Sequence, residues 1–359
     1  MNDAVSEPSW RAWARVAELP RSGQVAGRGV IRGQAEDFIV EEVPVQEPEG
    51  AGEHLWLWVE KRVENTEAVA KRLARAAGVK PMAVGYAGRK DRHALTRQWF
   101  SVHLPGGVGG EAPPSGFETE HVRVLRSSRH SRKLRVGGLR GNRFVLRMRE
   151  LEIDAPLLEQ RLRSVVERGV PNYFGEQRFG RGAANLEAAV RMFSGHPERD
   201  RKRRGLYLSA ARSAVFNGIL ARRVADNCWD KLLPGEAVML DGSNSFFVAD
   251  AVDTELEQRL AAHDIHPSGA LWGEGEPPCR NAAAQVEADV LGEADVLARG
   301  LVAAGLRQER RPLRLCPKNL HWSLDEADHS LMLEFMLPAG AFATAVLRDL
   351  LEYRDASSR

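Results

Sequence analysis

The sequence has little cysteine and no long hydrophobic run. Three cysteines, Cys228, Cys279 and Cys316, stand far apart and are odd in number, which argues against a disulfide framework and favours reduced thiols. No stretch of about 18 uncharged apolar residues occurs, so no transmembrane helix is expected. The start, MNDAVSEPSW, lacks the basic and apolar regions of a signal peptide. We therefore expect a cytoplasmic protein without a membrane partner.

Familiar motifs for cofactors, metals and nucleophilic serines are also missing. No G-x-S-x-G elbow is present. The segment GRGVIRG (27–33) is not G-x-G-x-x-G, and GEQRFGRG (175–182) lacks the Lys-Ser/Thr of a phosphate loop. The spacing of His263, His266 and Cys279 fits no common metal site, so ordinary loop residues are expected there. The sequence indicates no nucleotide cofactor and no metal.

Charge is nearly balanced overall but unevenly placed. The 359 residues are 43% hydrophobic and 28% charged with a net charge of +2, which suits a globular protein of two domains, or one domain with a large insertion. Residues 121–149 contain no Asp or Glu but ten cations: Arg123, Arg126, Arg129, Arg132, Lys133, Arg135, Arg140, Arg143, Arg147 and Arg149. We expect this stretch to bind phosphate. For the second cluster, residues 201–204, a solvated face is an equal alternative.

Hydrophobic periodicity divides the chain into a strand-rich part and a helical part. Alternating residues predict strands over 37–43, 53–61, 82–88, 97–104, 121–126, 142–150 and 330–338. Helical spacing predicts helices over 65–78, 155–169, 185–193, 208–227, 283–305 and 341–353. Because strand periodicity returns near the end, the simplest arrangement makes the helical unit an insertion into the first domain.

The segment NRFVLRMRE (142–150) combines an apolar and a basic face. Its two-residue period places Phe144, Leu146 and Met148 on one face, and Arg143 and Arg147 on the other. Such a sheet suits RNA, whose phosphates and unstacked bases accept arginine contacts, although DNA is not excluded. We expect neutralisation of the two arginines to weaken RNA binding and flatten its salt dependence.

One acid, Asp91, stands among cations in YAGRKDRHALTRQWFSV (86–102). Arg89, Lys90 and Arg92 flank it, and the predicted strands on either side place it on a connecting loop. Neighbouring positive charge favours the ionised carboxylate, so Asp91 is not expected to be a general acid. A nucleophile, a general base and a structural partner for arginine remain open, and Lys90 and Arg92 are candidates for keeping it anionic.

The same segment resembles the signature of the TruD family of tRNA pseudouridine synthases. Gly88, Lys90, Asp91, Ala94 and Thr96 match it. Further segments match in the same order: EDFIVEE (36–42), LRGNRF (139–144), VPNYFGEQRFG (170–180), LSAARSAVFN (208–217) and LPAGAFATAVLRDL (337–350). The resemblance extends from about residue 20 to residue 351.

The resemblance implies roles for individual residues. Asp91 is then the catalytic nucleophile, and Phe38, Asn142 and Phe342 line the pocket around the target base, with Lys90 beside it. Arg92, Arg143 and Arg147 are expected to contact RNA. Before the resemblance is considered, core residues are an equal alternative for the two phenylalanines, and a turn residue is the favoured interpretation of Asn142.

The resemblance also implies the architecture. The expected fold is α+β, with a mixed antiparallel sheet like that of other pseudouridine synthases and a mainly helical α/β insertion domain that forms a V-shaped cleft. The expected domains are 1–167 and 317–359 for the catalytic part and 168–316 for the insertion.

The implied reaction isomerises uridine to pseudouridine at position 13 of tRNA, in the D arm, without cofactor or metal, in a monomer without an obligate protein partner. Whether the aspartate attacks C1′, attacks C6 or acts as a base at the ribose stays open. Two other classes of protein remain as alternatives. A non-catalytic RNA-binding module would need the basic surface but not Asp91, and a nucleoside or glycoside hydrolase would usually need a second carboxylate.

Overall fold

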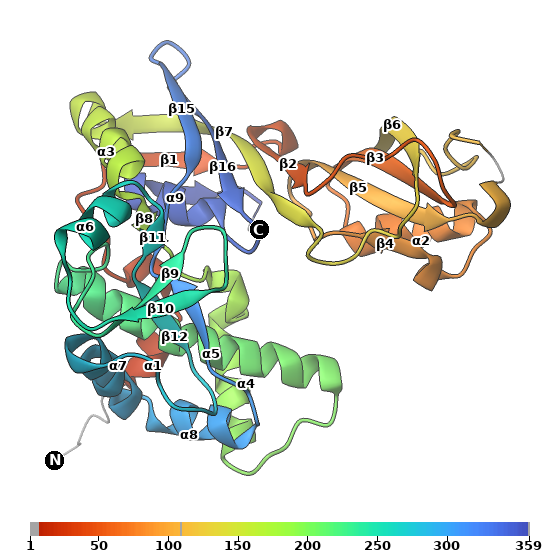
Figure 1. Cartoon of the computed structure of the whole chain (residues 1–359). Coiled ribbons are helices and arrows are strands. Elements are labelled where there is room, and N and C mark those ends of the chain that lie inside the picture. The colour runs from red at the N-terminus through yellow and green to blue at the C-terminus, as the bar shows by residue number, and fades with distance from the viewer. Residues whose placement is uncertain (1–6, 108–109, 358–359) are drawn as a thin grey trace, which may run out of the picture. The chain divides into compact units, whose positions relative to one another are not determined.

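The computed structural model describes residues 7–107 and 110–357 and separates into two compact units (Figure 1). The first, which we call the sheet unit, comprises Gly27–Asp154, Pro317–Ala341 and Leu351–Arg359. The second, the helical unit, comprises Met1–Ala26, Ala155–Cys316 and Phe342–Leu350. Each unit is therefore assembled from separate parts of the chain.

The described residues of the sheet unit form a ten-stranded mixed sheet. Its main path runs β15-β16-β7-β2-β5-β3-β6, while β1 pairs with β7 and β17, and β4 pairs with β5. The strands are β1 (Gly27–Ile31), β2 (Phe38–Pro44), β3 (His54–Arg62), β4 (Val84–Tyr86), β5 (Leu95–His103), β6 (Val122–His130), β7 (Leu139–Ile153), β15 (Lys318–Asp325), β16 (Ser330–Pro338) and β17 (Glu352–Asp355). In Figure 1 the blue β16 lies beside the yellow β7, although the two strands are far apart in the sequence.

Alternation along β7 sorts its side chains onto two faces of the sheet. Phe144 lies opposite Phe335 of β16 and Val40 of β2, and all three are buried. The Phe144 and Phe335 rings stack with centroids 5.6 Å apart. At Gly141 an added Cβ would lie 2.2 Å from the Leu337 carbonyl oxygen, so this close approach of two backbones requires glycine.

Helix α2 (Thr66–Ala76) covers one face of the sheet. Its Val69 and Leu73 are fully buried against Leu57, Phe100 and neighbouring apolar residues. On the opposite face Trp56 and Trp99 are also buried, with ring centroids 5.9 Å apart, so both tryptophans fill the core.

The helical unit is built around the long helix α5. Its helices are α1 (Ser9–Ala12), α3 (Ala155–Arg168), α4 (Ala184–Phe193), α5 (Arg201–Ala225), α6 (Thr254–Ala261), α7 (Asn281–Glu293), α8 (Asp295–Ala303) and α9 (Ala343–Leu350). Short strands accompany them: β8 (Val170–Pro171), β9 (Glu236–Leu240), β10 (Phe246–Ala249), β11 (Ile265–His266), β12 (Ser268–Leu271), β13 (Glu309–Pro312) and β14 (Arg314–Leu315). The fully buried Asn217 of α5 accepts a hydrogen bond from the Phe174 backbone N–H and donates to the Phe174 and Trp13 carbonyls.

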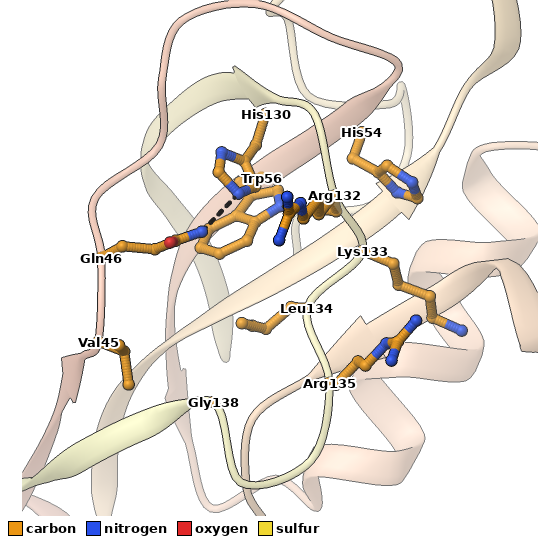
Figure 2. Close-up of a pocket in the computed structure, with 10 residues that line it drawn as sticks. All are labelled: Val45, Gln46, His54, Trp56, His130, Arg132, Lys133, Leu134, Arg135 and Gly138. Carbon is orange, nitrogen blue, oxygen red and sulfur yellow. Dashed lines mark hydrogen bonds between the residues drawn. The ribbon is translucent and has the colours of Figure 1, made fainter.

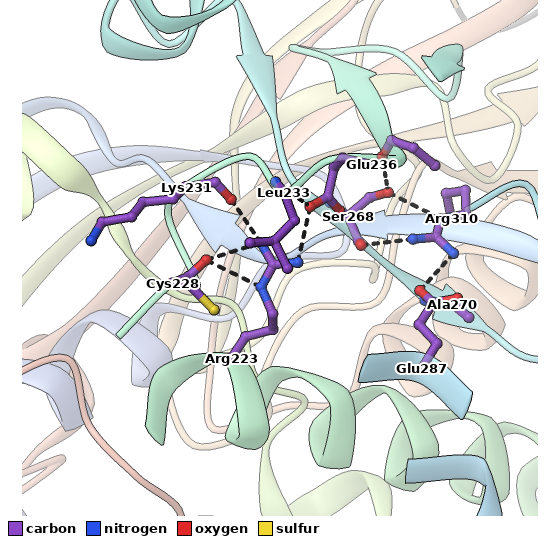
Figure 3. A network of polar contacts seen from close by, with 10 residues as sticks. Arg223, Cys228, Lys231, Leu233, Glu236, Ser268, Ala270, Glu287 and Arg310 are labelled. Carbon is purple, nitrogen blue, oxygen red and sulfur yellow. Dashed lines mark hydrogen bonds and ion pairs between the residues drawn. The ribbon is translucent and has the colours of Figure 1, made fainter. Parts of the chain in front are cut away.

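Two ion pairs lie sealed inside the helical unit (Figure 3). Arg223 pairs with Glu236 at 2.9 Å, and Arg310 pairs with Glu287 at 2.8 Å. The side chains of all four residues are at most 6% exposed. The Arg223 guanidinium also donates hydrogen bonds to the backbone carbonyls of Cys228 and Lys231. Both pairs are structural, because burial leaves neither of them open to a ligand, although Glu287 Oε2 has no hydrogen-bond partner among the described residues.

Most of the predicted elements are confirmed, with the following corrections. The predicted helix 283–305 is two helices, because the backbone at Ala294 leaves the helical region with φ −129° and ψ 40°. The predicted helix 341–353 ends at Leu350, and β17 begins two residues later. Helix α5 begins at Arg201, seven residues before the predicted start at 208. Strands β1, β8–β15 and β17 and helices α1 and α6 were not expected. The domain boundaries 1–167, 168–316 and 317–359 stay a prediction, as does the V shape. Among the described residues, no helix combines the length and the apolar character that crossing a membrane requires.

Candidate active site

Asp91 lies on the loop between β4 and β5, as the sequence predicts. Its Oδ2 accepts a hydrogen bond from Arg32 Nη2 at 2.5 Å, and its Oδ1 accepts one from the His93 backbone N–H at 3.0 Å. The Asp91 side chain is 25% exposed, whereas that of Arg32 is 5% exposed. Since each carboxylate oxygen has two acceptor positions, the group is anchored and still has capacity for a ligand.

Arg32 is the cation that pairs with Asp91, and the structure holds it on three sides. Its Nη1 donates to Asp355 Oδ2 of β17, and its guanidinium carbon lies 4.0 Å from the centre of the Phe38 ring. Arg32 also has φ +55°, a left-handed conformation that costs a non-glycine residue about 1–2 kcal/mol. A strained backbone that aims a buried guanidinium at a half-open carboxylate points to function.

Lys61 contributes a second buried cation beside the loop. Its Nζ donates to the Asp91 carbonyl at 3.1 Å and to the Glu64 carbonyl at 2.7 Å. Burial lowers the pKa of Lys61 to about 8, although the charges of Asp91 and Glu64 oppose that shift. The ammonium is therefore positioned against the backbone of Asp91 rather than against its carboxylate.

Lys90 points away from Asp91 towards a buried acid. Its Nζ lies 2.9 Å from Glu42 Oε2 and donates to Asn142 Oδ1 at 2.7 Å. Burial raises the pKa of Glu42, and the charge of Lys90 opposes this. Lys90, which precedes Asp91 in the chain, is thus brought together with Asn142, but Arg32 takes the place beside the carboxylate that the sequence suggested for Lys90.

A chain of buried polar groups fixes the loop. The Lys90 backbone N–H donates to Thr66 Oγ1 at 3.0 Å, and the Thr66 hydroxyl donates to Gln98 Oε1 at 3.0 Å. Gln98 Nε2 in turn donates to the Gly88 carbonyl at 2.9 Å. Helix α2 and strand β5 therefore hold the backbone on the N-terminal side of Asp91 in a single conformation.

Of three other predicted site residues, two lie in the sheet unit with Asp91 and one lies in the helical unit. Phe38 is 4% exposed and lies beneath Arg32, so the structure brings it together with Asp91. Arg92 is exposed on the same loop. Phe342 belongs to the helical unit, where it packs half-buried against the core around α5. Its role at the base stays a prediction.

Arg143 and Arg147 lie on the opposite face of the sheet from Asn142, because successive residues of β7 alternate. Arg143 pairs there with Glu41 at 2.6 Å and with Glu334 at 2.8 Å. The assignment of Arg143 and Arg147 as RNA contacts stays a prediction. The charge of Arg143 is already neutralised by the two acids. The structure does not bring this pair of arginines together with Asp91.

Cations without acid partners gather instead on the loop before β7. Arg132, Lys133 and Arg135 form no ion pair in the portion of the chain that is described. They line a pocket of about 700 Å³ whose apolar wall includes Leu134 and Trp56 (Figure 2). In the basic stretch, this loop is therefore a better phosphate-binding candidate than Arg143.

Sequence reasoning missed Arg32, Lys61 and Asp355. A signal for Lys61 was available, because it continues the buried alternation of residues 55, 57 and 59 in β3. Arg32 stands only four residues before the EDFIVEE segment, but nothing local to the sequence links it to Asp355.

Comparisons with known proteins match this architecture over nearly the whole chain. The family model of tRNA pseudouridine synthase D (TruD) matches residues 22–198 and 191–350. A tRNA pseudouridine synthase D from Aeromonas hydrophila is 48% identical over 334 residues, which cover 93% of this chain and 94% of that protein. One from Nitrosococcus oceani is 49% identical over 329 residues, which cover 91% of each.

A solved structure from Methanosarcina mazei, described as a tRNA pseudouridine synthase D, has the same fold. It aligns with a TM-score of 0.70 at 22% identity and covers 94% of this chain and 97% of its own. The α+β fold with a mixed sheet is that of a pseudouridine synthase. The chain belongs to the tRNA pseudouridine synthase D family, a family of isomerases. The family and the enzyme class expected from the sequence are confirmed.

Proposed function

We propose that this protein isomerises uridine to pseudouridine at position 13 of tRNA, in the D arm, with Asp91 as the nucleophile. The observation that carries the proposal is the Asp91 carboxylate, which is anchored by a buried arginine and yet 25% exposed. The relatives that bear the name tRNA pseudouridine synthase D, at 48–49% identity, support the substrate class.

The reaction requires only one reactive carboxylate. The N1–C1′ bond of uridine breaks, the uracil turns while it is held, and a C5–C1′ bond forms. C5 loses its proton and N1 gains one, so the product is an isomer and no electrons leave the system. Attack of Asp91 on C1′, attack on C6 and abstraction of a ribose proton all start from the same carboxylate oxygen.

Arg32 and Lys61 prepare this carboxylate. The Arg32 guanidinium stabilises the anion and fixes its orientation, because Asp355 and the Phe38 ring prevent the guanidinium from rotating away. Lys61 fixes the Asp91 backbone. A nucleophile oriented before the substrate arrives loses little entropy at the transition state.

Asn142 is suited to hold the uracil. Its Oδ1 accepts from Lys90, so its amide N–H groups can donate to a uracil carbonyl oxygen. Phe38 supports Arg32 from beneath, and we propose that Phe342 contacts the base. A target base must leave its stack to reach such a pocket, and a donor together with aromatic surface suits that state.

We propose that tRNA phosphates contact exposed cations of the sheet unit. Arg92 is placed next to Asp91 in the chain, and Arg132 and Lys133 form no ion pair among the described residues. Arg143 and Arg147 remain candidates with a smaller expected share. The protein is proposed to act in the cytoplasm as a monomer, without cofactor or metal.

The substrate assignment is tested with an unmodified tRNA transcript and the purified protein. Carbodiimide-stop sequencing should show pseudouridine at position 13, and a transcript with cytidine there should yield no product. Free uracil should not appear, because its release would identify a hydrolase instead. Binding of tRNA without any conversion would leave only an RNA-binding module.

A further inference from the structure

Two arginines of the helical unit face aromatic rings without an acid. The Arg311 guanidinium carbon lies 4.2 Å from the centre of the Phe174 ring and 5.5 Å from that of Phe216. The Arg178 guanidinium carbon lies 5.4 Å from the same Phe174 ring. Neither arginine forms an ion pair among the residues that the structure describes, and both are half-buried. Two cations therefore share one aromatic residue with no counter-ion.

Neutral groups satisfy only part of the two guanidinium groups. Arg311 Nη2 donates to Asn172 Oδ1 at 2.7 Å, and Arg178 Nη1 donates to Ser209 Oγ at 2.9 Å. Arg311 Nε is buried and has no hydrogen-bond partner within the described part of the chain. Guanidinium groups carry five N–H donors each, so both retain donors for an anion.

The electrostatics of this pair are unfavourable as they stand. Burial lowers the pKa of Arg178, and burial followed by the charge of Arg178 lowers the pKa of Arg311 to about 10. The next residue, Arg310, shows the usual structural solution, since Glu287 neutralises it at 2.8 Å. Aromatic faces offset some of the cost of burying a cation, but an anion between the two would offset more.

The pair lies near the segment that carries Phe342, within the same compact unit. A Cβ added to Gly175 would lie 3.9 Å from Thr344 Oγ1, so the residue after Phe174 lies close to the beginning of α9. Thr344 is two residues from Phe342, and Phe342 packs against the same core as Phe174. An anion bound by Arg178 and Arg311 would thus lie close to the segment proposed to contact the target base.

We propose that Arg178 and Arg311 together bind one phosphodiester of the substrate RNA. Paired guanidinium groups match the geometry and charge of a phosphate, and the anion relieves their mutual repulsion. This site explains why the NYFGEQR segment and Ser209 of the LSAARSAVFN segment meet in the fold. The inference rests on the proposed function, because it requires an RNA substrate.

The test measures tRNA affinity, its salt dependence, and kcat and KM for Arg178→Gln and Arg311→Gln. Each variant should bind unmodified tRNA about tenfold more weakly, which is the loss typical of a hydrogen bond to a charged group. The slope of log affinity against log salt should fall by about 0.7 to 1 per variant. KM should rise more than kcat falls, whereas a merely structural role would leave the salt slope unchanged.

Arg222→Gln is the matched control, because Arg222 lies on α5 in the same unit and its charge is paired with Glu293 at 2.9 Å on the surface. Its salt slope should match that of the wild type. If Arg311→Gln does not fold, Arg178→Gln decides the outcome, and Arg178→Lys should restore the salt slope but not the full affinity.

Unchanged affinity and slope in folded variants would overturn the inference, whereas a wild-type protein that makes no pseudouridine would overturn the proposed function instead. A second experiment uses inorganic phosphate as the ligand and measures the melting temperature. If phosphate raises the melting temperature of the wild type but not of Arg178→Gln, while tRNA binding is equal in both, the site holds a free anion and the RNA assignment is wrong.

Discussion

The two units use ion pairs in opposite ways. In the helical unit, Arg223 and Glu236 are 2% and 1% exposed, and backbone groups occupy their remaining donors and acceptors. In the sheet unit, Arg32 is buried to a similar degree, but its partner Asp91 is 25% exposed. In the first pair both partners are almost inaccessible to solvent, whereas in the second pair the carboxylate is partly accessible.

The difference separates stability from chemistry. A sealed pair cannot meet a substrate, and removing one member leaves an uncompensated buried charge. An open carboxylate held by a buried cation keeps free acceptor positions and a fixed direction. The position of the exposed partner, rather than the presence of an ion pair, therefore distinguishes the candidate active site from the framework.

Among the supporting contacts, the largest effect is expected where the sealed pair is broken. Glu236→Gln should reduce the free energy of unfolding by about 3–5 kcal/mol, because Arg223 stays buried without its acid. Chemical denaturation measures this loss. Glu293→Gln, which breaks a surface pair with Arg222, should cost at most about 1 kcal/mol. Equal losses in the two variants would remove the distinction between sealed and surface pairs.

Breaking the open pair should instead reduce the rate. Arg32→Gln should lower kcat about 10- to 100-fold, since it removes a charge-assisted hydrogen bond to Asp91. KM for tRNA should change little. Arg62→Gln is the control, because Arg62 pairs on the surface of the same unit with Glu36 at 3.0 Å. A folded Arg32→Gln protein with the wild-type kcat would show that this contact is only structural.

Burial of Lys61 should make the free energy of unfolding depend on pH. Its native pKa of about 8 lies below the ordinary value of 10.5, so between these pH values the unfolded chain binds more protons than the native protein. The contribution of Lys61 to stability is thus unfavourable below pH 8 and improves as pH rises to 10.5.

In Lys61→Met this rise should be absent, which changes the slope of unfolding free energy by up to about 1.4 kcal/mol per pH unit. Denaturant titrations across this pH range measure it. Parallel curves for the two proteins would mean that the ammonium is not desolvated.

The smallest effect is expected at Arg143. Because Glu41 and Glu334 already neutralise it, Arg143→Gln should weaken tRNA binding by less than about threefold. The double change Arg132→Gln and Lys133→Gln should weaken binding more and flatten its salt dependence. The reverse order would assign RNA binding to Arg143 rather than to the loop before β7.

Local patterns predicted much of this structure, and distant contacts account for what they missed. Alternation predicted β3 and β16, and helical spacing predicted α2. The strands predicted on either side of Asp91 correctly placed it on a loop. The partners of Arg32 lie 59 and 323 residues away, and only the pairing of β1 with β17 brings Asp355 to it.

The basic stretch shows the same limit. A count of charges along 121–149 finds no acid, but β2 and β16 supply Glu41 and Glu334 from outside that stretch. The sequence therefore predicted the composition of the surface and could not predict which cations remain unpaired.

The most direct test of the account is pseudouridine formation by Asp91→Asn with the protein in excess over bound tRNA. Asparagine keeps the size of the side chain and removes the negative oxygen. The account predicts a folded protein that binds tRNA like the wild type and forms product at a rate lower by a factor on the order of 10⁴ or more. Conversion at the wild-type rate would contradict it, because the open carboxylate would then not be the reacting group.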